Sequence, residues 1–181
     1  MKNLFSLVAL ILGLAASPVF AQRTDMSQQK IDFLLHGPRS SGYSAHSSGQ
    51  SLRNARQSTQ ELHDYTQTAR DACEPESAKI ESERIGNALQ SAKKSLVVVK
   101  RDAEHKGEPD IRKKAEAIEK HLDKALERHK QMDSECCKDK VDGTSVAGFC
   151  DEVLVELDKA LAEQQSLIRL MTVPPAKHPR K

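Results

Sequence analysis

The chain has 181 residues, of which 28 are lysine or arginine and 26 are aspartate or glutamate, giving a formal net charge of +2. Aromatic residues make up only 3% of the sequence, which argues against a β-sandwich or barrel, because those folds fill their sheets with aromatic and β-branched side chains. The near-neutral charge argues against nucleic acid as a partner, since non-specific phosphate binding requires a strongly basic surface.

Residues 1–21 have the pattern of a secretory signal peptide. Lys2 provides the positive start, an apolar stretch follows over residues 4–16, and Pro18 precedes small side chains at Val19 and Ala21. A membrane anchor is the alternative, but the apolar run is shorter than the ~20 residues that span a bilayer. We therefore predict cleavage after Ala21 and export to the periplasm or the extracellular space, the short leader favouring a bacterial periplasm.

Two further segments precede the main helical pattern, and one follows it. Residues 22–36 carry a short apolar patch and are predicted to form a short helical segment. Residues 37–50 are rich in serine and glycine, a composition that buries too little apolar surface to offset the cost of ordering, so they are predicted to be a flexible linker. Residues 173–181 form a basic tail that contains proline.

Residues 51–172 show four successive stripes of apolar or small residues spaced three and four apart, the spacing of one helix face. Pro75 and Pro109 suit first helical turns, Gly107 lies between the second and third stripes, and Thr144 or Ser145 is expected to cap the fourth helix. Short connections make neighbouring helices antiparallel. The sequence thus predicts an all-α protein: an up-down-up-down four-helix bundle with coiled-coil-like packing and a flexible N-terminal arm.

Four cysteines, Cys73, Cys136, Cys137 and Cys150, fall where an antiparallel bundle brings helix ends together. An even number of cysteines in an exported protein most often forms disulfides, which we expect to brace this end of the bundle. A bond between Cys136 and Cys137 needs a strained vicinal ring. Two pairings are left: Cys73 with Cys136 and Cys137 with Cys150, or the partners exchanged. The place of Cys136 on the inward stripe favours the first.

A metal site is the alternative use of the same residues. The thiols of Cys73, Cys136, Cys137 and Cys150 are ligands for copper or zinc, and His129 lies two turns before Cys136 on the same stripe. However, the compact spacing of zinc modules, such as paired Cys-x2-Cys, is missing. A histidine on an apolar stripe is also more often a hydrogen-bonded core residue than a ligand.

Signatures of enzymatic chemistry are missing from the sequence. It contains no Gly-x-Ser-x-Gly, no phosphate-binding glycine loop, no His-Glu-x-x-His and no Cys-x-x-Cys-His. We therefore predict no catalytic residues, no cofactor and no cofactor-binding residues. The predicted function is that of a non-enzymatic, exported helical bundle acting through contacts with an unidentified protein or with a second copy of itself. The alternative is a periplasmic copper- or zinc-binding protein.

Overall fold

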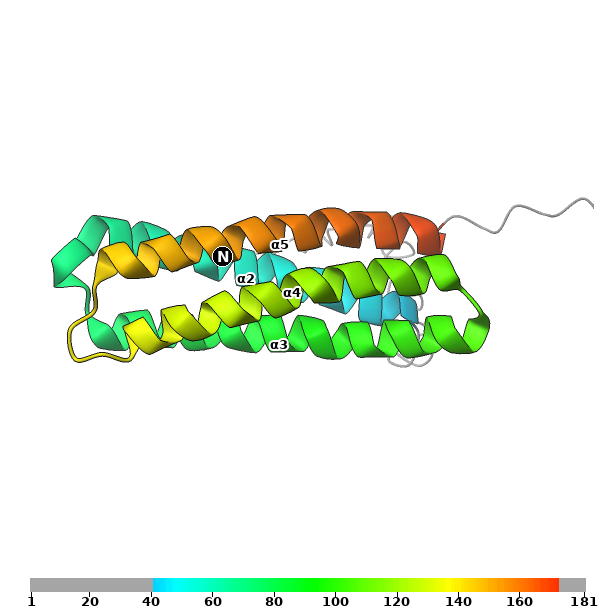
Figure 1. Cartoon of the computed structure of the whole chain (residues 1–181), viewed down its shortest axis with the longest axis horizontal. Helices are drawn as coiled ribbons and strands as arrows, with labels where there is room; N and C mark the ends of the chain where they lie inside the picture. The colour runs from blue at the N-terminus through cyan, green and yellow to red at the C-terminus, as the bar shows by residue number, and fades with distance from the viewer. Residues whose placement is uncertain (1–40, 173–181) are drawn as a thin grey trace, which may run out of the picture. The chain divides into compact units, whose positions relative to one another are not determined.

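The structure is a computed structural model that describes residues 41–172, which belong to the second of the two units into which the chain divides, 1–35 and 36–181. This region contains helices α2 (Ser41–Ala69), α3 (Pro75–Lys106), α4 (Pro109–Cys136) and α5 (Gly143–Thr172), with a 3₁₀ turn, η1 (Arg70–Ala72), after α2. The four helices lie side by side with alternating directions (Figure 1). Each contacts the next in the chain, and α5 also contacts α2. The predicted four-helix bundle is confirmed.

Three segments named by the sequence analysis lie outside the described residues. These are the expected signal peptide at 1–21, the short helical segment at 22–36 and the basic tail at 173–181. Their assignments stay predictions. None of the helices within residues 41–172 combines the length and the hydrophobicity needed to cross a bilayer.

The linker predicted over residues 37–50 is wrong for residues 41–50, which form the first turns of α2. Small side chains continue the buried stripe here, and they let α2 approach α5 closely. A Cβ added to Gly49 would lie 3.3 Å from Cγ of Gln164 on α5. Nε2 of Gln164 also donates a hydrogen bond to Ala45 O at 2.6 Å. The composition that looks like a linker is therefore what a close helix–helix contact requires; residues 37–40 lie outside the described part.

The ends of the other helices follow the local chemistry of the sequence. Pro75 and Pro109 occupy first turns, as predicted. Gly107 ends α3 with a left-handed φ of 67°, where a side chain would be strained. The cap of α5 differs from the prediction, because Asp142 rather than Thr144 or Ser145 fills this role. Its carboxylate accepts hydrogen bonds from Thr144 N at 3.0 Å and from the Ser145 hydroxyl at 2.6 Å.

The core consists of the inward stripes of the four helices. Alanines alternate with larger aliphatic side chains, so the helices pack closely around a narrow centre. Burying each large side chain contributes about 1.5–3 kcal/mol relative to leaving it in water. The largest fully buried ones are Leu52, Leu62, Ile85, Leu89, Leu96, Val99, Ile118, Leu122, Met132, Val141, Leu157 and Leu167.

Ion pairs along the seams between helices add to this packing. Arg56 of α2 pairs with Asp158 of α5 at 2.6 Å. On the α4–α5 seam, His121 Nδ1 lies 2.6 Å from Glu156 Oε2, and Lys159 lies 2.7 Å from the other oxygen of the same carboxylate. Burial raises the pKa of Glu156, but hydrogen bonds from Lys159 and His121 outweigh it and bring that pKa to about 2, against an ordinary value of 4.5.

The close approach of α5 to the end of α2 can be tested at Gly143, the first residue of α5. A Cβ at this position would lie 2.7 Å from Arg70 O and 2.8 Å from Thr66 O, both backbone atoms with little room to move. We expect Gly143→Ala to lower the free energy of unfolding by about 1–3 kcal/mol, as overpacking does in cores. Urea unfolding followed by circular dichroism measures this.

The matched control is Gly148→Ala in the same helix, where a Cβ would meet nothing within 4 Å. This change should leave the stability unchanged or raise it by up to about 1 kcal/mol, because alanine favours helix over glycine. Equal effects of the two substitutions would contradict the close contact at Gly143.

The lowered pKa of Glu156 should make the stability of the fold sensitive to acid. Because its pKa is lower in the folded state than in the unfolded state, the carboxylate stabilises the fold above about pH 4.5 and loses this contribution as the pH falls toward 2. In Glu156→Gln, the fall in unfolding free energy between these pH values should be smaller than in the unmodified chain. A carboxyl titration by NMR that places Glu156 near 4.5 would contradict the assignment.

Candidate functional site

The structure brings the four cysteines to one end of the bundle, where α2 and α4 end and α5 begins. Cys136 lies within electrostatic range of Cys73 and Cys137, and Cys150 lies within range of Cys136. Cys150 Sγ also contacts Met132 Sδ at 3.4 Å. Cys73, Cys136 and Cys150 are buried, whereas Cys137 is exposed.

The predicted disulfide brace is not found in the structure, since no two of these sulfurs lie at disulfide-bonding distance. The favoured pair of Cys137 with Cys150 would join an exposed residue at the end of α4 to a fully buried one in α5, and the structure does not support it. Burial also raises the pKa of the Cys136 and Cys150 thiols to about 12, from an ordinary value of 9.0. These two thiols are therefore protonated core groups, not nucleophiles.

His129 is a hydrogen-bonded core residue that ties α4 to α3. Its Nε2 lies 2.8 Å from Ser82 O, a carbonyl oxygen, so this nitrogen carries the proton and donates. The Ser82 hydroxyl in turn donates to Asp133 Oδ1 at 2.7 Å. Gly86 provides the space for the imidazole, because a Cβ there would lie 2.7 Å from His129 Cε1.

Ser82, His129 and Asp133 are the residue types of a hydrolytic triad, but their hydrogen bonds do not fit one. A triad needs a histidine nitrogen that accepts the serine proton and a carboxylate that orients the histidine. Here the serine donates to the carboxylate, and Nε2 of the histidine is already a donor. Ser82 is also fully buried. The arrangement positions helices and does not activate a nucleophile.

The structure gives no support to the alternative copper or zinc site at Cys73, Cys136, Cys137, Cys150 and His129. Among residues 41–172, no three or more histidine, cysteine, aspartate or glutamate side chains are grouped so that they could hold a metal ion. Cys137 is exposed while the other cysteines are buried, and Nε2 of His129 is used by Ser82.

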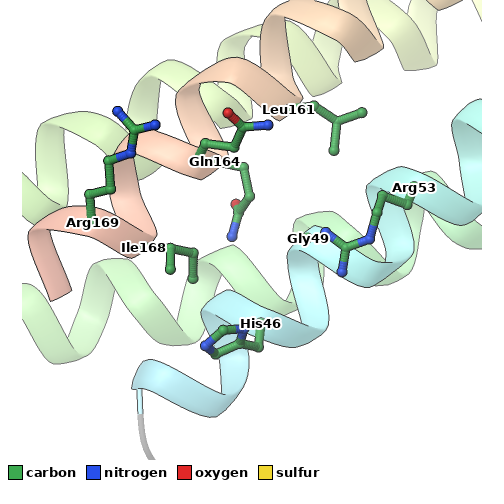
Figure 2. Close-up of a pocket in the computed structure, with 8 residues that line it drawn as sticks. His46, Gly49, Arg53, Leu161, Gln164, Ile168 and Arg169 are labelled. Atoms are coloured by element: carbon green, nitrogen blue, oxygen red, sulfur yellow. The ribbon is translucent and has the colours of Figure 1, made fainter. Parts of the chain in front are cut away.

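A groove between α2 and α5 is the site that sequence reasoning missed. Its volume is about 460 Å³, within the range of small-ligand sites. The groove is lined from α2 by His46, Gly49 and Arg53 and from α5 by Leu161, Gln164, Gln165, Ile168 and Arg169. Figure 2 shows the lining residues on the two helices, with the guanidinium groups of Arg53 and Arg169 at opposite sides of the view.

All the ionisable side chains that line the α2/α5 groove are basic. Two guanidinium groups, Arg53 and Arg169, and the imidazole of His46 line it, and no carboxylate does. Within the described part of the chain neither arginine forms a salt bridge; Arg53 donates only to the neutral oxygen of Gln50 at 3.0 Å. Farther along the same pair of helices, Arg56 is neutralised by Asp158. The groove thus concentrates positive charge that the described protein leaves unpaired.

Gln164 forms the buried floor of the α2/α5 groove. The residue is only 3% exposed, and Nε2 donates to Ala45 O, but Oε1 has no hydrogen-bond partner among the described residues. A buried polar atom left in this way costs about 1–3 kcal/mol and calls for an explanation. The sequence does contain one signal for this site, because Gln164 is a polar residue on the inward stripe of α5, between Ala160 and Leu167.

The different exposure of the four cysteines predicts their reactivity in the reduced protein. Cys137 should react with a thiol reagent such as DTNB at the rate of an exposed thiol, and the buried Cys136 and Cys150 at least about a hundredfold more slowly, because their thiolate forms are suppressed. Cys137→Ser should remove the fast phase. A fast phase that persists in this variant would contradict the burial of the others, and guanidinium should expose all of them.

Comparisons of the chain with protein-family models, with curated proteins and with solved structures gave no match. No activity is therefore carried over from a relative. What supports a function is the geometry of residues 41–172 itself: a helical bundle with a cationic groove between α2 and α5.

Proposed function

We propose that this chain is a non-enzymatic, exported helical bundle that acts by binding another protein at the α2/α5 groove. The observation that supports it most is that two guanidinium groups without a salt bridge among the described residues, Arg53 and Arg169, line this groove and no carboxylate does. Both arginines are exposed and have no salt-bridge partner among the described residues, so acidic groups of a partner protein would pair with them. The other polar cluster, around Ser82 and His129, is satisfied internally and buried.

The groove is suited to binding rather than to chemistry. A general base or nucleophile needs a partner that shifts its pKa or takes its proton. Of the residues that line the groove, only His46, Arg53 and Arg169 are titratable, and none of the three has a carboxylate partner among the described residues. Arginine stays protonated and serves as a rigid donor for carboxylates. The proposal of export rests on the pattern of residues 1–21 alone.

Photo-crosslinking in the cells that make the protein tests both parts of the proposal. With p-benzoylphenylalanine in place of Gln165, an exposed residue that lines the groove, we expect one discrete protein adduct on irradiation. The recovered chain should begin at Gln22, which mass spectrometry of its N-terminal peptide reads directly. Arg53→Glu in the same chain should lower the adduct yield by about fivefold or more, since it reverses a groove charge.

The matched control places the same crosslinker at Gln90, an exposed glutamine of α3, a helix outside the groove. Adducts of equal yield and mass at both positions, or none at position 165, would contradict binding at the groove. A chain that keeps its first residues would contradict export.

A further inference from the structure

We propose that the α2/α5 groove binds an acidic amphipathic helix of another protein, which faces the groove with aliphatic side chains seven residues apart and carries carboxylates on either side of them. This inference rests on the proposed function and names the chemistry of the partner at the same site. It follows from the order of apolar and basic side chains along the groove, and it uses only side chains that are exposed or half-buried.

The two arginines of the groove lie toward its opposite ends. Gly49 of α2 packs against Gln164 of α5, so these two residues mark one level of a pair of antiparallel helices. Arg53 follows Gly49 by four residues, and Arg169 follows Gln164 by five. Because the helices run in opposite directions, the two arginines lie on opposite sides of this level, about 13 Å apart along the seam at 1.5 Å per residue.

An aliphatic side chain accompanies each arginine. Leu161 precedes Gln164 by three residues and therefore lies toward Arg53. Ile168 follows Gln164 by four residues and therefore lies toward Arg169. Both aliphatic side chains are half-buried and pack against the core, whereas both arginines are exposed. The groove thus presents the same pair twice, an aliphatic contact with a cation at the same end.

The spacing of the aliphatic side chains favours a helix as the partner. Leu161 and Ile168 are seven residues apart, which is about 10.5 Å or two helical turns. In a partner helix that lies along the seam, side chains at positions i and i+7 share one face at this same spacing. An extended chain repeats one face every ~6.7 Å and so does not match both contacts. It would also gain no main-chain hydrogen bonds, because helices offer no free sheet edge.

The charge of the groove sets the sign of the residues that flank the aliphatic ones in the partner. Arg53, Arg169 and His46 line the groove, and no carboxylate of the described residues does. Glutamates or aspartates on both sides of the aliphatic pair would find guanidinium donors, whereas lysines would meet like charge. Because exposed ion pairs add little affinity individually, the aliphatic contacts supply most of the binding free energy and the charges supply its specificity.

A second copy of the chain does not offer such a helix face within residues 41–172. The exposed large hydrophobic side chains of this region are Tyr43, Ile80, Val97, Val155 and Leu170. No two of them are seven residues apart on one helix. The occupant that fits the groove is therefore a helix of a different protein.

Isothermal titration calorimetry with residues 22–181 tests the assignment. The probe is an acetylated and amidated peptide of fourteen residues, with leucine at its third, seventh and tenth positions, glutamate at its first, second, twelfth and thirteenth, and alanine elsewhere. One control peptide has lysine in place of every glutamate. The other has the same composition, with the leucines at its third, fifth and seventh positions, the spacing of a strand face. We expect the probe to bind with a Kd of about 100 µM or lower, and both controls about tenfold or more weakly.

Charge reversal locates the site. The double variant Arg53→Glu/Arg169→Glu should bind the glutamate peptide about tenfold or more weakly, and the lysine peptide more tightly, than the unmodified chain does. The matched control is Lys94→Glu/Arg101→Glu, which changes the net charge equally at two exposed positions of α3 outside the groove. This control should leave the Kd of the glutamate peptide within twofold.

Truncation of one aliphatic side chain tests the apolar contact. Ile168→Ala should weaken binding of the glutamate peptide by about fivefold, because it removes apolar area that the partner would cover. Val97→Ala, at an exposed valine of α3, should leave it within twofold. Urea unfolding confirms that each variant is folded, and NMR of the bound peptide labelled with ¹³C should give helical chemical shifts.

Equal binding of the glutamate and lysine peptides, equal binding of the two leucine arrangements, or no binding of the probe up to about 1 mM would overturn the assignment. Extended chemical shifts in the bound peptide would do so as well. A dimer of the chain that Arg53→Glu dissociates in sedimentation would place a second copy in the groove instead. If the peptides fail while the adduct at position 165 still forms, the inference about the acidic helix is wrong and the proposed function stands. If the adduct also fails, both are wrong.

Discussion

Close approach of α2 to α5 through small side chains is the constraint on which the rest of this bundle depends. Gly49 lies against Gln164 near the start of α2, and Gly143 lies against the backbone carbonyls of Thr66 and Arg70 at its end. At both places a single methyl group would enter space that another helix already uses. The helices can therefore bury narrow stripes rich in alanine and serine, because short interhelical distances compensate for small side chains with more contacts per atom.

Helix boundaries that depend on local chemistry could be predicted from the sequence, and those that depend on packing could not. Pro75, Pro109 and Gly107 act within one turn of themselves, so α3 and α4 lie where their stripes and breaks indicate. The start of α2 depends instead on what α5 presents to it across 119 residues of chain, at the bond from Gln164 to Ala45. Composition alone assigns residues 41–50 to a linker for this reason.

The candidate sites show the same division. Periodicity places the four cysteines at one end and His129 on an inward stripe, which the structure bears out as a buried, hydrogen-bonded histidine. Whether neighbouring sulfurs can bond depends on how each helix is rotated about its axis, which the sequence does not specify, and here Cys137 is exposed while Cys150 is fully buried. The α2/α5 groove could not be predicted, because it depends on which side chains two helices far apart in the sequence bring to one seam: two arginines line it, and no carboxylate does.

That mismatch matters because the other seams of the bundle avoid it. Lys114 with Glu163 and Arg128 with Glu152 join α4 to α5, and Arg56 with Asp158 joins α2 to α5. Such exposed pairs contribute little stability individually, so their presence reflects charge matching more than folding free energy. Near the start of α2 the matching stops: Arg53 and Arg169 have no carboxylate partner among the described residues, and the buried Oε1 of Gln164 has no hydrogen-bond partner there. Unmatched arginines add nothing to the stability of the bundle but are available to a binding partner, and for this reason we propose binding at this end rather than among the buried thiols.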